Sequence, residues 1–243
     1  MPQLFPKGMN VISRLVVLGL PVLGGAGAVA GAAFYRSDYS TGTREIVEQP
    51  VPFSHKHHVS ELGIGCQYCH TSAEVSASAG FPPTRTCMNC HQQIWVSAEL
   101  LQPVRDSFVS SASNAVGKPI PWTKVHNVPH YVYFNHSIHL AKGVGCYSCH
   151  GRVDQMSLLF QTKSLLMEWC LDCHREPEKH LRPKAEVYNL AWQPADYRDP
   201  TTGKQEDRET GQPYTQLNLG KKLKEEYQVR DQSVLTNCSI CHR

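Results

Sequence analysis

Residues 146–150 read Cys-Tyr-Ser-Cys-His, and the same arrangement occurs five times in the 243-residue chain. In each copy two residues separate the cysteines, which suits two thioether bonds to the vinyl groups of one porphyrin, and the next residue, histidine, falls under the iron. The five copies use all ten cysteines. Covalent haem attachment is therefore predicted at Cys66, Cys69, Cys87, Cys90, Cys146, Cys149, Cys170, Cys173, Cys238 and Cys241. The proximal iron ligands are predicted to be His70, His91, His150, His174 and His242.

Two other uses of paired cysteines must be weighed against haem. Cys-x-x-Cys pairs also build zinc sites, and exported proteins use paired thiols for disulfides. Neither use explains why histidine follows every second cysteine. We therefore expect five covalently bound haem c groups.

Composition bounds the fold class. Hydrophobic residues make up 41% of the chain, and five haems would add a large apolar volume that side chains need not supply. We expect a mostly α and irregular multihaem cytochrome c with a haem-filled core. The net charge of +3 comes without a basic block interleaved with aromatics, which argues against nucleic acid as a partner.

An amino-terminal apolar segment predicts one transmembrane helix. Lys7 and Arg14 precede an uncharged run of 21 residues, 15–35, which is long enough to cross the roughly 30 Å hydrocarbon core of a bilayer. Positive residues before a membrane helix stay in the cytoplasm, so the residues after the helix would lie on the other side of the membrane. For a bacterial cytoplasmic membrane, this is the periplasmic, extracytoplasmic side. A cleaved signal peptide is the alternative, since 28–30 read Ala-Val-Ala, but the run is longer than a usual signal-peptide core.

The remainder contains an internal duplication. Residues 53–58 and 134–139 share the pattern Phe-x-His-x-x-His, and a Gly-x-Gly then leads into a haem motif in each case. The predicted organisation is an anchor at 1–36, a linker at 37–52 and a pentahaem domain at 53–243. That domain comprises dihaem modules at about 53–93 and 134–175 and a terminal haem at 238–242. The charged, turn-rich connector 175–236 is expected to lie over the surface or against a partner.

Five further axial ligands are needed to close the five irons. Histidines three apart on one turn can reach two neighbouring haems. The predicted distal ligands are His55, His58, His126, His136 and His139. His57, His130 and His180 are expected to serve as surface or supporting residues. Met156 is the alternative distal ligand and Met167 a weaker candidate, and methionine would raise the potential of its haem.

Several segments resemble the ActA family, the membrane-anchored pentahaem cytochrome c subunits of bacterial alternative complex III. The resemblance covers almost everything after Gln49, and its most specific segments are 52–59, 81–84, 132–136, 151–156, 168–175 and 238–243. It implies a quinol-oxidising respiratory complex in the membrane. The implied partners are an iron–sulfur, molybdopterin-enzyme-like subunit, a quinol-binding multi-helix membrane subunit and a mono-haem cytochrome c subunit. Electrons would pass on to a downstream cytochrome c or oxidase.

The axial ligands bear on what such a chain can do. An iron with two protein ligands exchanges electrons and has no position for substrate, so no catalytic residue is expected on this chain alone. A stand-alone membrane-anchored carrier or quinol dehydrogenase is the first alternative, although one helix offers little wall for a quinol pocket. A multihaem oxyanion reductase is the second, but no motif replaces its histidine by lysine.

Overall fold

The computed structural model describes residues 6, 8–108, 117–208 and 210–242. Lys7, one of the two leading positive residues of the predicted anchor, lies outside this range, as do parts of the expected anchor segment and of the stretch between the two modules. The chain divides into two compact units, Met1–Thr43 and Arg44–Arg243.

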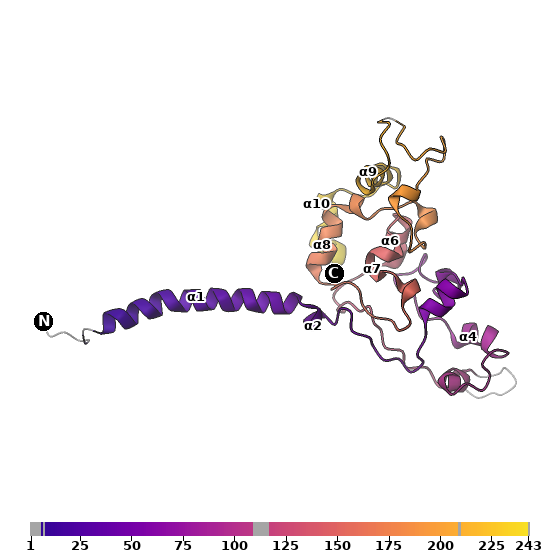
Figure 1. Cartoon of the computed structure of the whole chain (residues 1–243), viewed down its shortest axis with the longest axis horizontal. Helices are drawn as coiled ribbons and strands as arrows, with labels where there is room; N and C mark the ends of the chain where they lie inside the picture. The colour runs from indigo at the N-terminus through magenta and orange to yellow at the C-terminus, as the bar shows by residue number, and fades with distance from the viewer. Residues whose placement is uncertain (1–5, 7, 109–116, 209, 243) are drawn as a thin grey trace. The chain divides into compact units, whose positions relative to one another are not determined.

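The first unit consists of a long helix and a short one (Figure 1). Helix α1 (Met9–Arg36) has 28 residues, buries no side chain within the described structure and contains an 18-residue window with a mean hydropathy of 2.0. At the helical rise it measures about 42 Å, so by length and composition it can cross a bilayer. Pro21 lies inside it, which membrane helices tolerate better than water-exposed ones. Helix α2 (Asp38–Thr41) follows, capped by Ser37, within the segment expected to be a linker.

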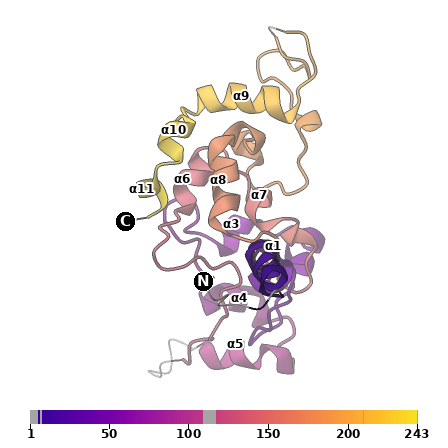
Figure 2. The same cartoon turned by 90° about the vertical axis from the view of Figure 1, so that its left-hand side faces the viewer.

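The second unit is built from short helices joined by irregular segments, with no strand in the part of the chain that the structure describes (Figure 2). This confirms the predicted mostly α and irregular fold class. The five haem motifs lie on the short helices α3 (Cys66–Cys69), α4 (Thr84–His91), α7 (Cys146–His150), α8 (Met167–Arg175) and α11 (Cys238–Cys241). The other elements are η1 (Lys56–Glu61), η2 (Glu99–Leu101), α5 (Gln102–Ser107), α6 (His136–Ala141), η3 (Val153–Gln155), η4 (Pro177–Lys179), η5 (Lys184–Glu186), η6 (Pro194–Asp196), α9 (Gln216–Glu226) and α10 (Gln232–Leu235).

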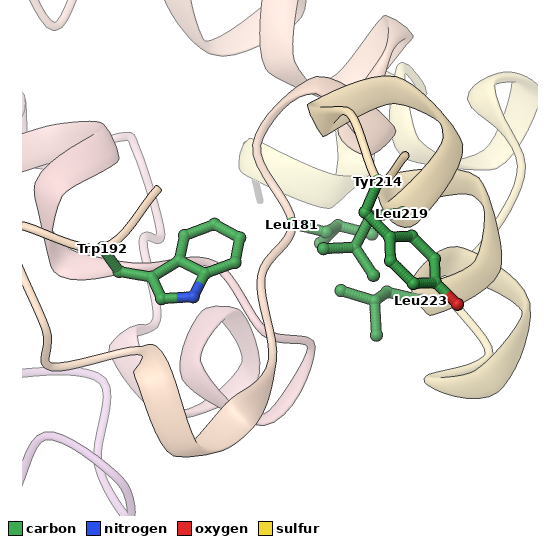
Figure 3. Close-up of a cluster of buried hydrophobic side chains, with 5 residues drawn as sticks. All are labelled: Leu181, Trp192, Tyr214, Leu219 and Leu223. Carbon is green, nitrogen blue, oxygen red and sulfur yellow. The ribbon is translucent and has the colours of Figure 1, made fainter. Parts of the chain in front are cut away.

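The connector between the fourth and fifth motifs has an apolar core of its own. Leu219 and Leu223, one turn apart on α9, pack with Leu181, Trp192 and Tyr214, and all five side chains are buried. Figure 3 shows the Tyr214 ring beside the two α9 leucines, with the Trp192 indole pointing toward Leu181. The low apolar periodicity of the connector did not reveal this core. Its core residues come from far-apart irregular stretches as well as from one helix, so they show no periodicity in the sequence.

A second cluster surrounds the second motif. Val51, Met88 and Val104 are buried together, and Met88 lies between the two cysteines of that motif. Helices α4 and α5 supply two of the three side chains.

Candidate haem-binding centre

Each motif takes the same local form. A helix of four or more residues begins at or before the first cysteine, so the two cysteines, three apart, lie on one side of the turn. Gly65 and Gly145, directly before the first and third motifs, have extended backbones that start these turns. This is the geometry that two thioether bonds to one macrocycle require.

The duplicated Phe-x-His-x-x-His elements have nearly identical ring packing. Phe53 stacks on His58 with ring centroids 4.3 Å apart, and meets His55 edge-on at 4.9 Å. Phe134 repeats both contacts in the second module. It stacks on the second histidine at 4.6 Å, and its edge contact with the first is 4.8 Å. The phenylalanine in each copy therefore holds two imidazoles at a fixed angle, a role that the repeat pattern alone did not identify.

The backbone differs between the two copies. The first is a π-helical turn, η1, with His55 at its N-cap, whereas the second is the α-helix α6, which begins at His136. Single π-helical turns occur preferentially at functional sites. Both turns lead to glycines in the left-handed region, Gly63 at φ +70° and Gly143 at φ +78°. The duplication thus preserves the positions of the side chains more closely than the hydrogen bonding of the turn.

Three motif histidines face a second imidazole across a gap. The ring centroids of His58 and His91 are 6.3 Å apart, and those of His139 and His174 are 6.2 Å apart. A third pair joins His136 to His150 at 6.4 Å, with ring planes only 13° apart. A metal–imidazole bond of about 2 Å, with the ring centroid about 1 Å behind the bonded nitrogen, puts two axial imidazoles about 6 Å apart. The centroid separations of the three pairs therefore match this distance.

Hydrogen bonds select the tautomer of seven imidazoles. In each of them Nδ1 lies 2.7–3.1 Å from a backbone carbonyl oxygen, which can only accept, so in the neutral ring Nδ1 carries the proton and Nε2 keeps its lone pair. Iron-ligating histidines are oriented in this way by their surroundings. Four are motif histidines and three are predicted distal ligands: His70, His91, His174, His242, His58, His136 and His139.

The other two predicted distal histidines, His55 and His126, are partly buried, and each has one buried ring nitrogen without a hydrogen-bond partner. Nε2 of His126 and Nδ1 of His55 are buried without a hydrogen-bond partner, which is costly unless another group completes them. Burial, with a smaller contribution from His136, lowers the pKa of His126 to about 4. Burial followed by the neighbouring His70 lowers the pKa of His55 to about 4. Both imidazoles are thus neutral near pH 7, as a metal ligand must be.

His126 does not face a motif histidine across an iron-sized gap in this structure. Its ring meets that of His150 edge-on at 4.3 Å, which is too close for a metal between them. Burial, followed by His126 and His136, lowers the pKa of His150 to about 3. The structure thus brings His126 into the cluster around the third motif without assigning it to an iron.

The three histidines that were predicted to be surface or supporting residues lie in different surroundings from the distal candidates. His57 is half exposed, and its Nδ1 lies 2.7 Å from a carboxylate oxygen of Glu61. His130 is exposed. His180 is partly buried at the end of η4, and burial lowers its pKa. Of the two methionines, Met156 is buried and its carbonyl accepts a hydrogen bond from Lys56 of η1, whereas Met167 is 64% exposed.

A buried guanidinium beside the third motif was not identified from the sequence. The Arg182 side chain crosses directly over Gly145, where a Cβ would collide with it, and Nη1 donates to the carbonyl of Asn189 at 2.8 Å. The group also lies 5.1 Å from the centre of the Trp192 ring. No sequence pattern marks this residue, since it reaches the motif through a tertiary contact. It places a positive charge next to the third attachment site.

Comparison with known proteins gives a partial relationship. No protein-family model matches the chain. The chain is 36% identical over 103 residues to the multihaem cytochrome c subunit of menaquinone reductase from Nitratidesulfovibrio vulgaris. The match covers 42% of this chain and 46% of that protein, so the chain spans about half the length of the curated relative. It is thus distantly related, over part of its length, to a multihaem cytochrome c.

Proposed function

We propose that this chain is a pentahaem electron-transfer protein that α1 anchors in the cytoplasmic membrane, and that it serves as a subunit of a quinone-linked respiratory complex. The observation that carries the proposal is the set of three imidazole pairs with 6.2–6.4 Å between ring centroids, each containing the histidine of a Cys-x-x-Cys-His motif. Zinc or disulfide chemistry at the cysteines would give no reason for these gaps.

The gaps suggest a ligand assignment. His58 would complete the second site with His91, and His139 the fourth with His174. His136 would complete the third with His150. By the duplication, His55 would then complete the first site with His70. His126, whose ring lies 4.3 Å from that of His150, and Met156 remain candidate distal ligands, and these gaps assign neither of them to a site.

The chain's own residues would hold each iron closed on both sides. When bound, haem c supplies a one-electron iron couple. Carbonyl groups accept hydrogen bonds from Nδ1, which would leave Nε2 available to hold an iron, and the two phenylalanines would prevent the paired imidazoles from turning. Such a site excludes water and small substrates from the metal, which favours electron transfer over catalysis on this chain.

The membership that we propose is in a complex of the alternative complex III type. The resemblance of segments such as 52–59 and 168–175 to the ActA family supports it, and the relative from menaquinone reductase is itself named as the subunit of a quinone-reacting enzyme. The proposed partners are an iron–sulfur, molybdopterin-enzyme-like subunit, a quinol-binding multi-helix membrane subunit and a mono-haem cytochrome c subunit. The haem unit would lie on the periplasmic side.

The subunit composition of the native assembly tests this function. The complex is solubilised from its own membranes in mild detergent, purified through a tag on this chain and identified by mass spectrometry. An iron–sulfur subunit and a multi-helix quinol-binding subunit are the expected result, and a mono-haem cytochrome would distinguish the alternative complex III type. A chain recovered alone, with all five haems, would reject complex membership and leave an anchored carrier.

A further inference from the structure

The second motif (87–91) lies beside the first (66–70). Asn89, between the cysteines of the second motif, donates a hydrogen bond to the hydroxyl of Tyr68, between those of the first, at 3.0 Å. The π-helical turn η1 connects the two motifs. Its residue His58 lies near His91 of the second motif, and its N-cap residue, His55, lies near His70 of the first. The first two sites are thus adjacent.

The first motif is also adjacent to the third (146–150). His136, which faces His150, donates from Nδ1 to the carbonyl of Ala77 at 2.8 Å, just after the first motif. The backbone N–H of Ser137 donates to the carbonyl of Ser76 in the same loop. Helix α6 therefore spans from the loop of the first motif to the third site.

The row continues through the fourth motif (170–174) to the fifth (238–242). Helix α6 carries His136 toward the third site and His139 toward the fourth. The fourth motif then contacts the segment before the fifth, because Nδ1 of His174 donates to the carbonyl of Leu235 at 2.8 Å. In Figure 2, α4 lies below the group formed by α3, α7 and α8, and α11 lies to the left of that group.

From these contacts we infer that the five sites form a single row in the order second, first, third, fourth, fifth, and that single electrons are exchanged with redox partners at its two ends, the second and fifth sites. Cys90 and Cys238 are the two of the ten cysteines that are exposed, and they belong to these end motifs. The inference rests on the proposed function, since it needs haem at all five sites. It makes the first site, which comes earliest in the chain, an interior one.

A light-driven injection experiment tests the order. In the full-length holoprotein all native cysteines carry haem, so Ser233→Cys in α10 gives one free thiol for a ruthenium polypyridyl label near the fifth motif. Repeated flashes with a sacrificial donor send electrons in at that end, and haem absorbance counts the rapidly reduced sites. One variant then removes the first attachment site (Cys66→Ala with Cys69→Ala), and a matched control removes the second (Cys87→Ala with Cys90→Ala).

The inferred order gives different results for the two variants. Without the first site, three of the four remaining haems should be reduced rapidly and the second should lag, because its only neighbour is gone. Without the second site, all four should be reduced rapidly. A row in sequence order would give the reverse result and would overturn the inference. Fewer than five covalent haems in the unaltered protein would instead reject the proposed function.

Iron positions in the unaltered holoprotein provide a second test that needs no variant to fold. Anomalous diffraction or cryo-electron microscopy should place the second iron next to the first and farthest from the fifth. A second iron whose nearest neighbour is the third would reject the order, even if both site-removal variants were unstable.

Discussion

At the scale of single residues, the two Phe-x-His-x-x-His elements show how few groups are needed to aim an imidazole. The backbone carbonyl of Ser54 accepts a hydrogen bond from Nδ1 of His58, four residues later. In the same way, the carbonyl of Asn135 accepts one from Nδ1 of His139. A phenylalanine ring stacks on each from the other side. Each second histidine is thus fixed by its own turn and needs no distant residue for its orientation.

The proposed ligand His58 can be tested against its neighbour His57. His58→Ala should convert one of five low-spin haems to high spin, because the second iron would lose its distal ligand. Electron paramagnetic resonance should show a new high-spin signal from about a fifth of the iron. His57→Ala should leave all five low spin, since that imidazole pairs with Glu61 at the surface. Unchanged low-spin spectra from both variants would refute the assignment.

The attachment residues could be predicted from sequence, but the pairing of ligands could not. A Cys-x-x-Cys-His motif acts within five residues, so its chemistry is local. The gap between His136 and His150, by contrast, depends on a tertiary contact that joins His136 to Ala77, 59 residues away. Arg182 reaches the third motif in the same non-local way. Spacing predicts which side chains can serve as ligands, and only the fold shows which motif histidine each of them lies beside.

At the scale of elements, α9 packs unusually close to η4. A Cβ on Gly220 would collide with the backbone carbonyl of Glu178, which cannot rotate away as a side chain would. Gly220→Ala should therefore destabilise α9 by about 1–3 kcal/mol, even though alanine favours a helix by about 1 kcal/mol over glycine. Hydrogen exchange of the α9 amides should speed up roughly 10-fold or more, whereas Lys221→Ala on the exposed face should change it little. Slower exchange in Gly220→Ala would show that the two backbones are farther apart.

The same region contains a buried acid. Asp199 accepts from Lys222 at 2.7 Å and from the backbone N–H of Thr201 at 2.8 Å, and these bonds hold its pKa below the usual value. Since the folded pKa is lowered, its stabilisation is present above the unfolded pKa of about 4 and is lost as pH falls below it.

Asp199→Asn should accordingly speed α9 exchange at pH 7, and the difference from the native chain should shrink as pH falls from about 5 toward 3. Exchange rates corrected for their intrinsic pH dependence measure this directly. A difference that stays constant across the range would mean that packing, not the charge of Asp199, holds the segment.

Some secondary-structure elements can be predicted from the sequence and others cannot, for a physical reason. The long apolar run of α1 and the short motif helices follow from local composition and spacing. The π-helical form of η1 does not, because it and α6 have nearly the same sequence pattern. The connector core was missed because Leu181, Trp192 and Tyr214 come from separate irregular stretches. Such packing leaves no periodic trace.

At the scale of the whole molecule, α1 and the haem unit should separate cleanly. A chain that begins at Asp38 behind a cleavable signal, expressed without partner subunits, should be recovered in the soluble periplasmic fraction with five haems. The full chain should remain in membranes and keep its amino terminus, as shown by sequencing the mature protein. A mature terminus near Gly31 would identify α1 as a signal peptide.

The sparse apolar core has a consequence for how the protein is made. In the part of the chain that the structure describes, twelve apolar side chains are buried, few for a unit of this size. The polypeptide by itself therefore gains little from collapsing, and the proposed haems would have to contribute much of the driving force. Newly exported chains would remain largely unfolded and sensitive to proteases until their cysteines are joined to porphyrin. Cellular supply of haem would then set how much of the protein survives.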